Sequence, residues 1–314
     1  MTATILVAGA TGNTGRGVVE TLSKLLKTST TLSGTRILAL TRSLQSPVAQ
    51  QFAGLPGVEV LEKNWVDITP DWLREQGVTR AFIASHNEPN QFPEESSFHL
   101  AALNAGVQYV VRISTAAANV RPDCGAYYPR QHWAIEALLS SPEFAALQWT
   151  SLQPNLFHSF ALGTAAALIK EHRKTGKQDT LRLLSPENAP LAIVDPSEVG
   201  ALAAHLLAQA DPSPHNKERY IVNGPEDITG AQIVKLVEEY IGTPVENVIF
   251  RDMSWVDAMA AASPGSKSVI LSVKSSLNTL TSEKSLASAT SKAVLDLAPP
   301  TRTPADALKA LLEE

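Results

Sequence analysis

Three glycines spaced three residues apart follow the apolar run Ile5–Ala8, and a helical pattern continues from them to Leu25. A strand, a glycine turn and a helix N-terminus in this order are typical of dinucleotide binding. The turn lets the backbone approach a pyrophosphate, and the free N–H groups of the first helical turn face the anion. The expected cofactor contacts of the turn are Gly9, Thr11, Gly12, Asn13, Thr14 and Gly15.

Short apolar runs alternate with helical patterns through the first half of the chain. Repeated strand–helix units of this kind predict an α/β fold, a doubly wound parallel Rossmann sheet with helices on both faces. Strands are expected at Thr4–Ala8, Arg36–Thr41, Val58–Leu61, Arg80–Ala84, Gln108–Ile113 and Gln148–Leu152, and helices near 13–27, 46–53, 70–76, 94–105 and 130–140.

The pattern loosens after Pro154, which predicts a smaller, mostly helical C-terminal lobe that binds substrate. We expect residues 1–155 to form the Rossmann domain, with 190–224 returning to it, and 156–189 and 225–314 to form the lobe. Within these parts the sequence predicts helices over 156–173, 199–207, 229–242 and 267–283, and a hairpin around 180–193.

Composition excludes several classes of protein. With a net charge of −5, the chain of 314 residues has no general attraction for nucleic acid or an anionic membrane. Cys124 is the only cysteine, so neither a disulfide framework nor a cysteine metal site is expected. The first strand begins by Thr4 and no run reaches the length of a membrane span, so we expect a cytoplasmic protein.

The end of the second strand distinguishes NAD from NADP in this fold. Here the strand ends in Arg42-Ser43 rather than in an acidic residue, and an arginine can pair bidentately with a 2′-phosphate. NADP(H) is therefore the expected cofactor. Asp67, after the third strand, is either an adenine contact or a simple turn residue. Further cofactor contacts are expected at the ends of the fourth and sixth strands, from Ala84, Ser85, Pro154 and Asn155.

Together these pieces resemble the NmrA-like family of atypical short-chain dehydrogenases. The matching segments are 9–15, Arg42, 101–107, Ser114-Thr115, His132 with Glu136, 149–157, and 194–195 with 198–200. The resemblance implies either an NADPH-dependent reductase of quinones, imines or unsaturated carbonyls, or a regulator that senses NADP without turning it over.

Short-chain dehydrogenases use a serine, a tyrosine and a lysine four residues after the tyrosine. By this resemblance Ser114, Tyr128 and His132 are the expected catalytic residues, with histidine in place of the lysine. A protonated imidazole can help a phenol donate a proton. Against this pairing, histidine is mostly neutral near pH 7, and Pro129 biases Tyr128 away from helical geometry. The resemblance also places His132 beside the nicotinamide ribose, although it can equally be a packing residue at the start of a helix.

Other side chains are expected at the same carboxyl-end crevice. His86 follows the fourth strand, and Phe157 and His158 follow the sixth, so we expect all three to contact substrate. No ligand spacing accompanies the histidines, and no metal is expected.

Three functions are compatible with these residues. The favoured one is an NADP(H)-dependent oxidoreductase acting on a small carbonyl, enone, quinone or imine. The second is a redox-sensing regulator that binds NADP and a protein partner without catalysis. The third is a non-redox cyclase or isomerase with His132 or His86 as base.

Overall fold

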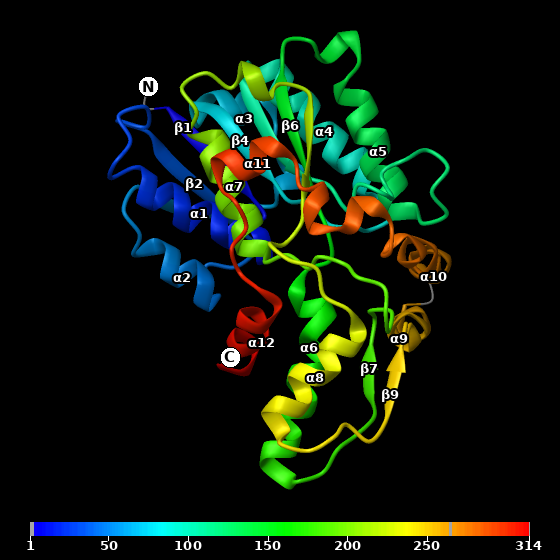
Figure 1. The fold of residues 1–314 in the computed structure, drawn as a ribbon. Helices are drawn as coiled ribbons and strands as arrows, with labels where there is room; N and C mark the ends of the chain where they lie inside the picture. Colours follow the sequence, from blue (N-terminus) through cyan, green and yellow to red (C-terminus); the bar gives the residue numbers. More distant parts are fainter. Residues whose placement is uncertain (1–2, 264–265, 314) are drawn as a thin grey trace.

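Seven parallel strands form the central sheet of the computed structural model, which describes residues 3–263 and 266–313. The strand order β3-β2-β1-β4-β5-β6-β8 reverses beside β1, as in a doubly wound sheet, so the predicted Rossmann fold is confirmed. Figure 1 shows the sheet above a separate group of helices. The strands are β1 (Thr4–Ala8), β2 (Arg36–Thr41), β3 (Val58–Glu62), β4 (Val78–Ile83), β5 (Tyr109–Ile113), β6 (Gln148–Pro154) and β8 (Glu218–Val222).

Alternate residues of the strands face two separate cores, one on each side of the sheet. Ile5 and Val7 of β1 belong to one core, whereas Leu6 and Ala8 belong to the other. This is the geometry of a strand, whose successive side chains point to opposite faces. The first core is covered by α1 (Asn13–Leu25), α2 (Pro47–Ala53) and α7 (Pro196–Leu207), and the second by α3 (Pro70–Glu75), α4 (Gln91–Ala105) and α5 (Tyr127–Leu139).

The six strands expected from the sequence are present, with bounds shifted by at most two residues. The sequence analysis missed β8, which pairs with β6 at the edge of the sheet. Two of its five residues, Glu218 and Arg219, are exposed, so its apolar pattern is too short to recognise. Both α4 and α5 begin three residues earlier than expected.

The C-terminal lobe contains α6 (His158–Thr175) and α8 (Gly230–Ile241) around a core of their own. The predicted hairpin around 180–193 is wrong. Strand β7 (Leu181–Leu183) pairs in parallel with β9 (Val248–Phe250), and the chain between them passes through α7, β8 and α8. The helix expected over 267–283 ends at Ser276 and continues as a 3₁₀ turn, Leu277–Thr279. The lobe also holds α9 (Ser254–Ala262), α10 (Lys267–Ser276) and α12 (Pro304–Glu313).

Near its end the chain returns to the sheet through α11 (Lys292–Leu297), whose Val294 joins the core beneath α7. The preceding Ser291 lies on the outer edge of β8. Its backbone N–H donates to the carbonyl of Ile221 (3.0 Å), and its hydroxyl accepts from the N–H of Ile221 (2.9 Å). The outer edge of β8 is thus covered by the segment that precedes α11.

Over residues 3–263 and 266–313, the structure contains no helix with both the length and the apolar character needed to cross a membrane.

Candidate active site

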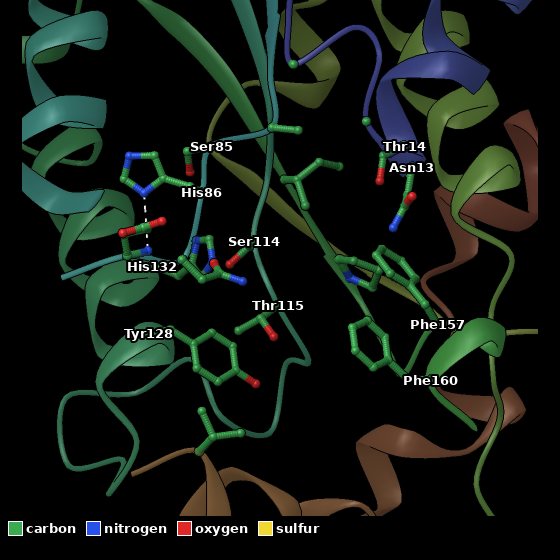
Figure 2. Close-up of a pocket in the computed structure, with 18 of the residues that line it drawn as sticks. Asn13, Thr14, Ser85, His86, Ser114, Thr115, Tyr128, His132, Phe157 and Phe160 are labelled. Carbon is green, nitrogen blue, oxygen red and sulfur yellow. Dashed lines mark hydrogen bonds between the residues drawn. The ribbon is translucent and has the colours of Figure 1, made fainter. Parts of the chain in front are cut away.

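A cavity of about 950 Å³ opens at the carboxyl ends of the central strands. In Figure 2, Asn13 and Thr14 of the glycine turn lie on one side of it, and Ser85, Ser114 and His132 lie on the other. The remaining wall comes from α9, α10 and the start of α6. The cavity therefore joins the expected dinucleotide site to the C-terminal lobe.

The three glycines of the turn have different roles in bringing the backbone close to a ligand. Gly9 has φ +79°, and a Cβ there would lie 2.7 Å from the carbonyl oxygen of Ala84. Gly12 lines the cavity and donates its N–H to Gly9 (3.0 Å). Gly15 lies behind the turn, where a Cβ would come within 2.1 Å of the Gly9 carbonyl oxygen. Gly15 thus sets the contact between helix and strand, and Thr11–Thr14 with Gly9 form the wall of the cavity.

Beyond β2, Arg42, the expected 2′-phosphate contact, is exposed and lines the cavity. Lys63 lines it as well, which the sequence analysis did not single out. Ser43 and Asp67 are exposed and lie outside the lining. The hydroxyl of Ser43 accepts from the N–H of Gln45 (3.2 Å) and closes a turn.

The ends of β4 and β6 supply Ala84, Ser85, Pro154 and Asn155, all of which line the cavity. The side-chain amide of Asn155 donates to the carbonyls of Ala192 (2.7 Å) and Ser285 (3.0 Å). These two bonds fix the amide, and its buried Oδ1 has no partner among the residues that the structure describes. An acceptor is therefore held ready at the lobe side of the dinucleotide site.

Ser114 follows β5 and is only 5% exposed. Its backbone N–H donates to the carbonyl of Leu152 (2.7 Å), which holds the residue at the end of the sheet. Its hydroxyl lies at the cavity and, within the described part of the chain, has no hydrogen-bond partner. A buried hydroxyl without a partner costs free energy, which a bound ligand would recover.

Tyr128 and His132 lie one turn apart on α5 and both line the cavity. Their rings meet edge to face with centroids 6.4 Å apart. Pro129 sits in the first turn of α5, where its missing N–H is not needed, so it does not separate the two side chains. The Tyr128 hydroxyl donates to Ser276 at the end of α10 (3.4 Å).

The surroundings of His132 disfavour the protonated imidazole considered from the sequence. Burial, followed by the positive charge of Arg112, lowers the pKa of His132 to about 3. A guanidinium N–H of Arg112 donates to Nδ1 of His132 (2.8 Å). The ring is therefore neutral near pH 7 and cannot assist Tyr128 as a lysine would.

Arg112 belongs to a buried ionic cluster that the sequence analysis missed. Its Nε donates to Glu95 of α4 (2.7 Å), and one terminal nitrogen, Nη1, donates to Ser151 of β6 (3.0 Å) and Glu136 of α5 (3.5 Å). Arginine and glutamate are rarely buried unless paired. The cluster lies directly behind the cavity.

His86 and Glu94 form a half-buried pair, with 2.5 Å between Nε2 and Oε2. The His86 ring also faces Trp65, with centroids 5.6 Å apart. Since Trp65 and Lys63 follow β3, this end of the cavity lies beside the loop expected to hold adenine. His158, in contrast, is buried at the start of α6 outside the lining, where its backbone N–H donates to the carbonyl of Val194 (3.1 Å).

The lobe presents an apolar wall opposite Ser114. Phe157 and Phe160 lie close together in Figure 2, and the Phe160 ring lies 6.5 Å from that of Trp255. Helices α9 and α10 complete this wall, which the sequence did not predict, with Met259, Val269, Ile270 and Val273, and the 3₁₀ turn after α10 adds Leu277. The described residues contain no cluster of three histidine, cysteine or acidic side chains suited to a metal ion.

Comparison with known proteins identifies the family. The profile of the NmrA-like family matches residues 1–258. The chain belongs to the NmrA-like family. A (4-alkanoyl-5-oxo-2,5-dihydrofuran-3-yl)methyl phosphate reductase from Streptomyces griseus is 30% identical over 77% of this chain and 75% of its own. An NAD(P)H azoreductase from Xenophilus azovorans is 26% identical over 78% of this chain and 76% of its own.

Among solved structures, an NADPH-dependent quinone oxidoreductase from Escherichia coli, complexed with NADPH, matches with a TM-score of 0.71. It is 21% identical, and the match covers 98% of this chain and 99% of the other. The family predicted from the glycine turn, Arg42 and the strand ends is thus confirmed.

Proposed function

We propose that this NmrA-like protein is an NADPH-dependent reductase of a flat, uncharged, conjugated acceptor such as a quinone, an enone or an imine. One observation carries the proposal. One cavity joins the glycine turn to an aromatic and aliphatic wall, and the hydroxyl of Ser114, which has no hydrogen-bond partner in the described part of the chain, lies where the two halves meet.

The relatives confirm the two broader predictions, that the protein is a reductase and that its cofactor is NADP(H). The acceptors named for these relatives are a dihydrofuranone phosphate, an azo compound and a quinone. What they share is a conjugated electrophile, and we carry only that feature to this chain.

The residues of the dinucleotide half fit NADPH. The glycine turn leaves its backbone accessible, and α1 begins there with Asn13 and Thr14. Arg42 and Lys63 supply positive charge for the 2′-phosphate. The Oδ1 of Asn155, without a partner over residues 3–263 and 266–313, would accept from the nicotinamide carboxamide.

When bound, NADPH supplies a hydride to the electrophilic carbon of the acceptor, and a proton completes the product at the heteroatom. Ser114 would donate a hydrogen bond to that heteroatom and orient the acceptor. Tyr128 is the proposed proton source, because it lines the same cavity. Phe157, Phe160 and Trp255 would exclude water and stack on a flat ring.

The test is NADPH oxidation by the purified protein with a panel of quinones, enones, imines and azo compounds. We expect turnover with at least one uncharged conjugated class, and slower turnover with matched acceptors that carry a phosphate. Tight NADPH binding without turnover across the panel would contradict the proposal and favour the NADP-sensing regulator. Chemistry that persists without NADPH would favour the cyclase or isomerase.

A further inference from the structure

We propose that Arg112 is a positioning residue that holds His132 as a neutral imidazole with its proton on Nε2, as a hydrogen-bond donor at the cavity. The role of this donor in catalysis rests on the proposed reductase function. The protonation and tautomer of the ring do not.

The tautomer follows from the donor inventory of arginine. A guanidinium has N–H donors and no acceptor, so the atom it contacts must accept. Arg112 contacts Nδ1 of His132 at 2.8 Å, which leaves the single proton of a neutral ring on Nε2. The Oδ1 of Asn87, which also lines the cavity, lies 3.2 Å from Nε2 and accepts that proton.

Charge balance explains why the ring stays neutral. Arg112 lies between the buried carboxylates of Glu95 and Glu136. Arg219 reaches Glu136 from the outer side (2.8 Å). Two negative and two positive groups are thus matched, and a proton on His132 would add an unmatched charge beside a guanidinium in a buried site.

The other groups around the ring do not change this balance. Gln91 of α4 and Asn87 are uncharged, and Tyr128 of α5 meets the ring edge to face. His99 of α4 contacts Glu95 (3.4 Å), and burial lowers the pKa of His99, so it also stays neutral.

His132 therefore differs from the lysine whose place it takes. It would stabilise developing negative charge on the acceptor, or a hydroxyl of the cofactor, when that group takes the place of the Asn87 Oδ1 at the Nε2–H, and it keeps its proton throughout. Glu95 holds the guanidinium of Arg112 in place, and Arg112 holds Nδ1 of His132. The orientation of the His132 ring at the cavity therefore depends on Glu95, which does not line the cavity itself.

The test follows the protonation of the two imidazole nitrogens of His132 by nitrogen-15 NMR in the full-length protein, between about pH 5 and pH 8. In the wild type we expect Nδ1 without hydrogen and Nε2 with hydrogen over this whole range. In Arg112→Met, the buried carboxylate of Glu95 is left near the ring without its cation, whereas Glu136 keeps Arg219, and we expect His132 to titrate at or above its ordinary pKa of about 6.5. A new inflection at that pH is expected in the rate of NADPH oxidation.

Two further variants keep the test decisive. Glu95→Gln/Arg112→Met removes an opposite pair of charges, and it should fold with His132 neutral but present as both tautomers. Arg219→Met is the matched control, because Arg219 shares Glu136 but does not contact the ring, and it should leave both nitrogens unchanged. A wild-type ring with its proton on Nδ1, or protonated near pH 7, would overturn the proposal. So would a wild-type NMR pattern in both Arg112 variants. A wild-type protein that has the expected tautomer but oxidises NADPH with no acceptor would contradict the proposed reductase function and leave the tautomer proposal standing.

Discussion

Gly17 of α1 and Gly200 of α7 pack against each other with no room for a side chain on either. A Cβ on Gly200 would lie 2.9 Å from the Cα of Gly17 and 2.2 Å from the carbonyl oxygen of Thr14. A Cβ on Gly17 would lie 2.2 Å from the carbonyl oxygen of Ser197. Since α1 begins at the cofactor turn, this helix contact also fixes the position of that turn.

Gly17→Ala is expected to destabilise the protein by about 2 kcal/mol or more, because two helix backbones must separate to admit the methyl group. Chemical unfolding monitored by circular dichroism measures the loss. The matched control is Gly163→Ala in α6, where nothing lies within 4 Å of the added Cβ, and it should be neutral or stabilising by about 0.5–1 kcal/mol. Equal losses at both positions would contradict the packing argument.

Arg42→Ala should weaken NADPH binding by about tenfold to a hundredfold, the equivalent of about 1.5–3 kcal/mol for a hydrogen bond to a charged group. NADH lacks the 2′-phosphate, so its affinity should change little. Fluorescence titration with both nucleotides separates the two cases. Arg74→Ala, an exposed arginine paired with Asp71 outside the cavity, should change neither affinity.

Ser114→Ala should lower kcat by about tenfold to a hundredfold and leave NADPH affinity nearly unchanged, since its hydroxyl is proposed to contact the acceptor. Steady-state kinetics with the preferred acceptor measure the change. Ser185 supplies a matched control: it is also buried with an unpartnered hydroxyl among the described residues, but it lies outside the cavity lining. Full activity in Ser114→Ala would remove Ser114 from the site.

Stability should fall as the pH is lowered from about 6.5 to about 4.5. The pKa of His132 is lowered to about 3 in the folded state, so in this window the unfolded chain binds a proton that the folded chain does not. The contribution approaches 1.4 kcal/mol per pH unit. The pKa of Glu95 is held well below 4.5, chiefly by Arg112, so the loss from its protonation comes at lower pH.

His132→Asn keeps an acceptor for Arg112 and removes the titrating ring, so its free energy of unfolding should depend less steeply on pH across that window. Denaturant unfolding at several pH values gives the slope. A variant slope equal to the wild type at position 132 would show that His132 titrates normally.

Local pattern sufficed for the elements nearest the cofactor. The apolar run of β1, the glycine turn and the arginine after β2 are each encoded in a few consecutive residues; β1 has the predicted bounds, and residues of the turn and Arg42 line the cavity. The pairing of β7 with β9 could not be predicted in this way, because two three-residue strands acquire their partner only when α8 packs on α6.

The site divides in the same way. Arg112 reads as one polar residue in a buried strand and Glu95 as an ordinary helical glutamate, and only the packing of α4 on the sheet brings them together. The cavity wall from α9 and α10 was equally hard to predict, because the apolar residues of these helices, such as Trp255 and Val273, follow the pattern of any amphipathic helix. The sequence therefore predicts the cofactor site better than it predicts the acceptor site.

The hydrogen bonds between Ser291 and Ile221 restrict how the lobe can be exchanged between relatives. A chimera that replaced everything after the sheet would remove the segment that covers the edge of β8. The bare edge would then offer unpaired backbone groups to a second molecule, a route to aggregation. Grafts meant to change acceptor preference should therefore keep residues 290–297 with the sheet and exchange only the chain between β8 and that segment.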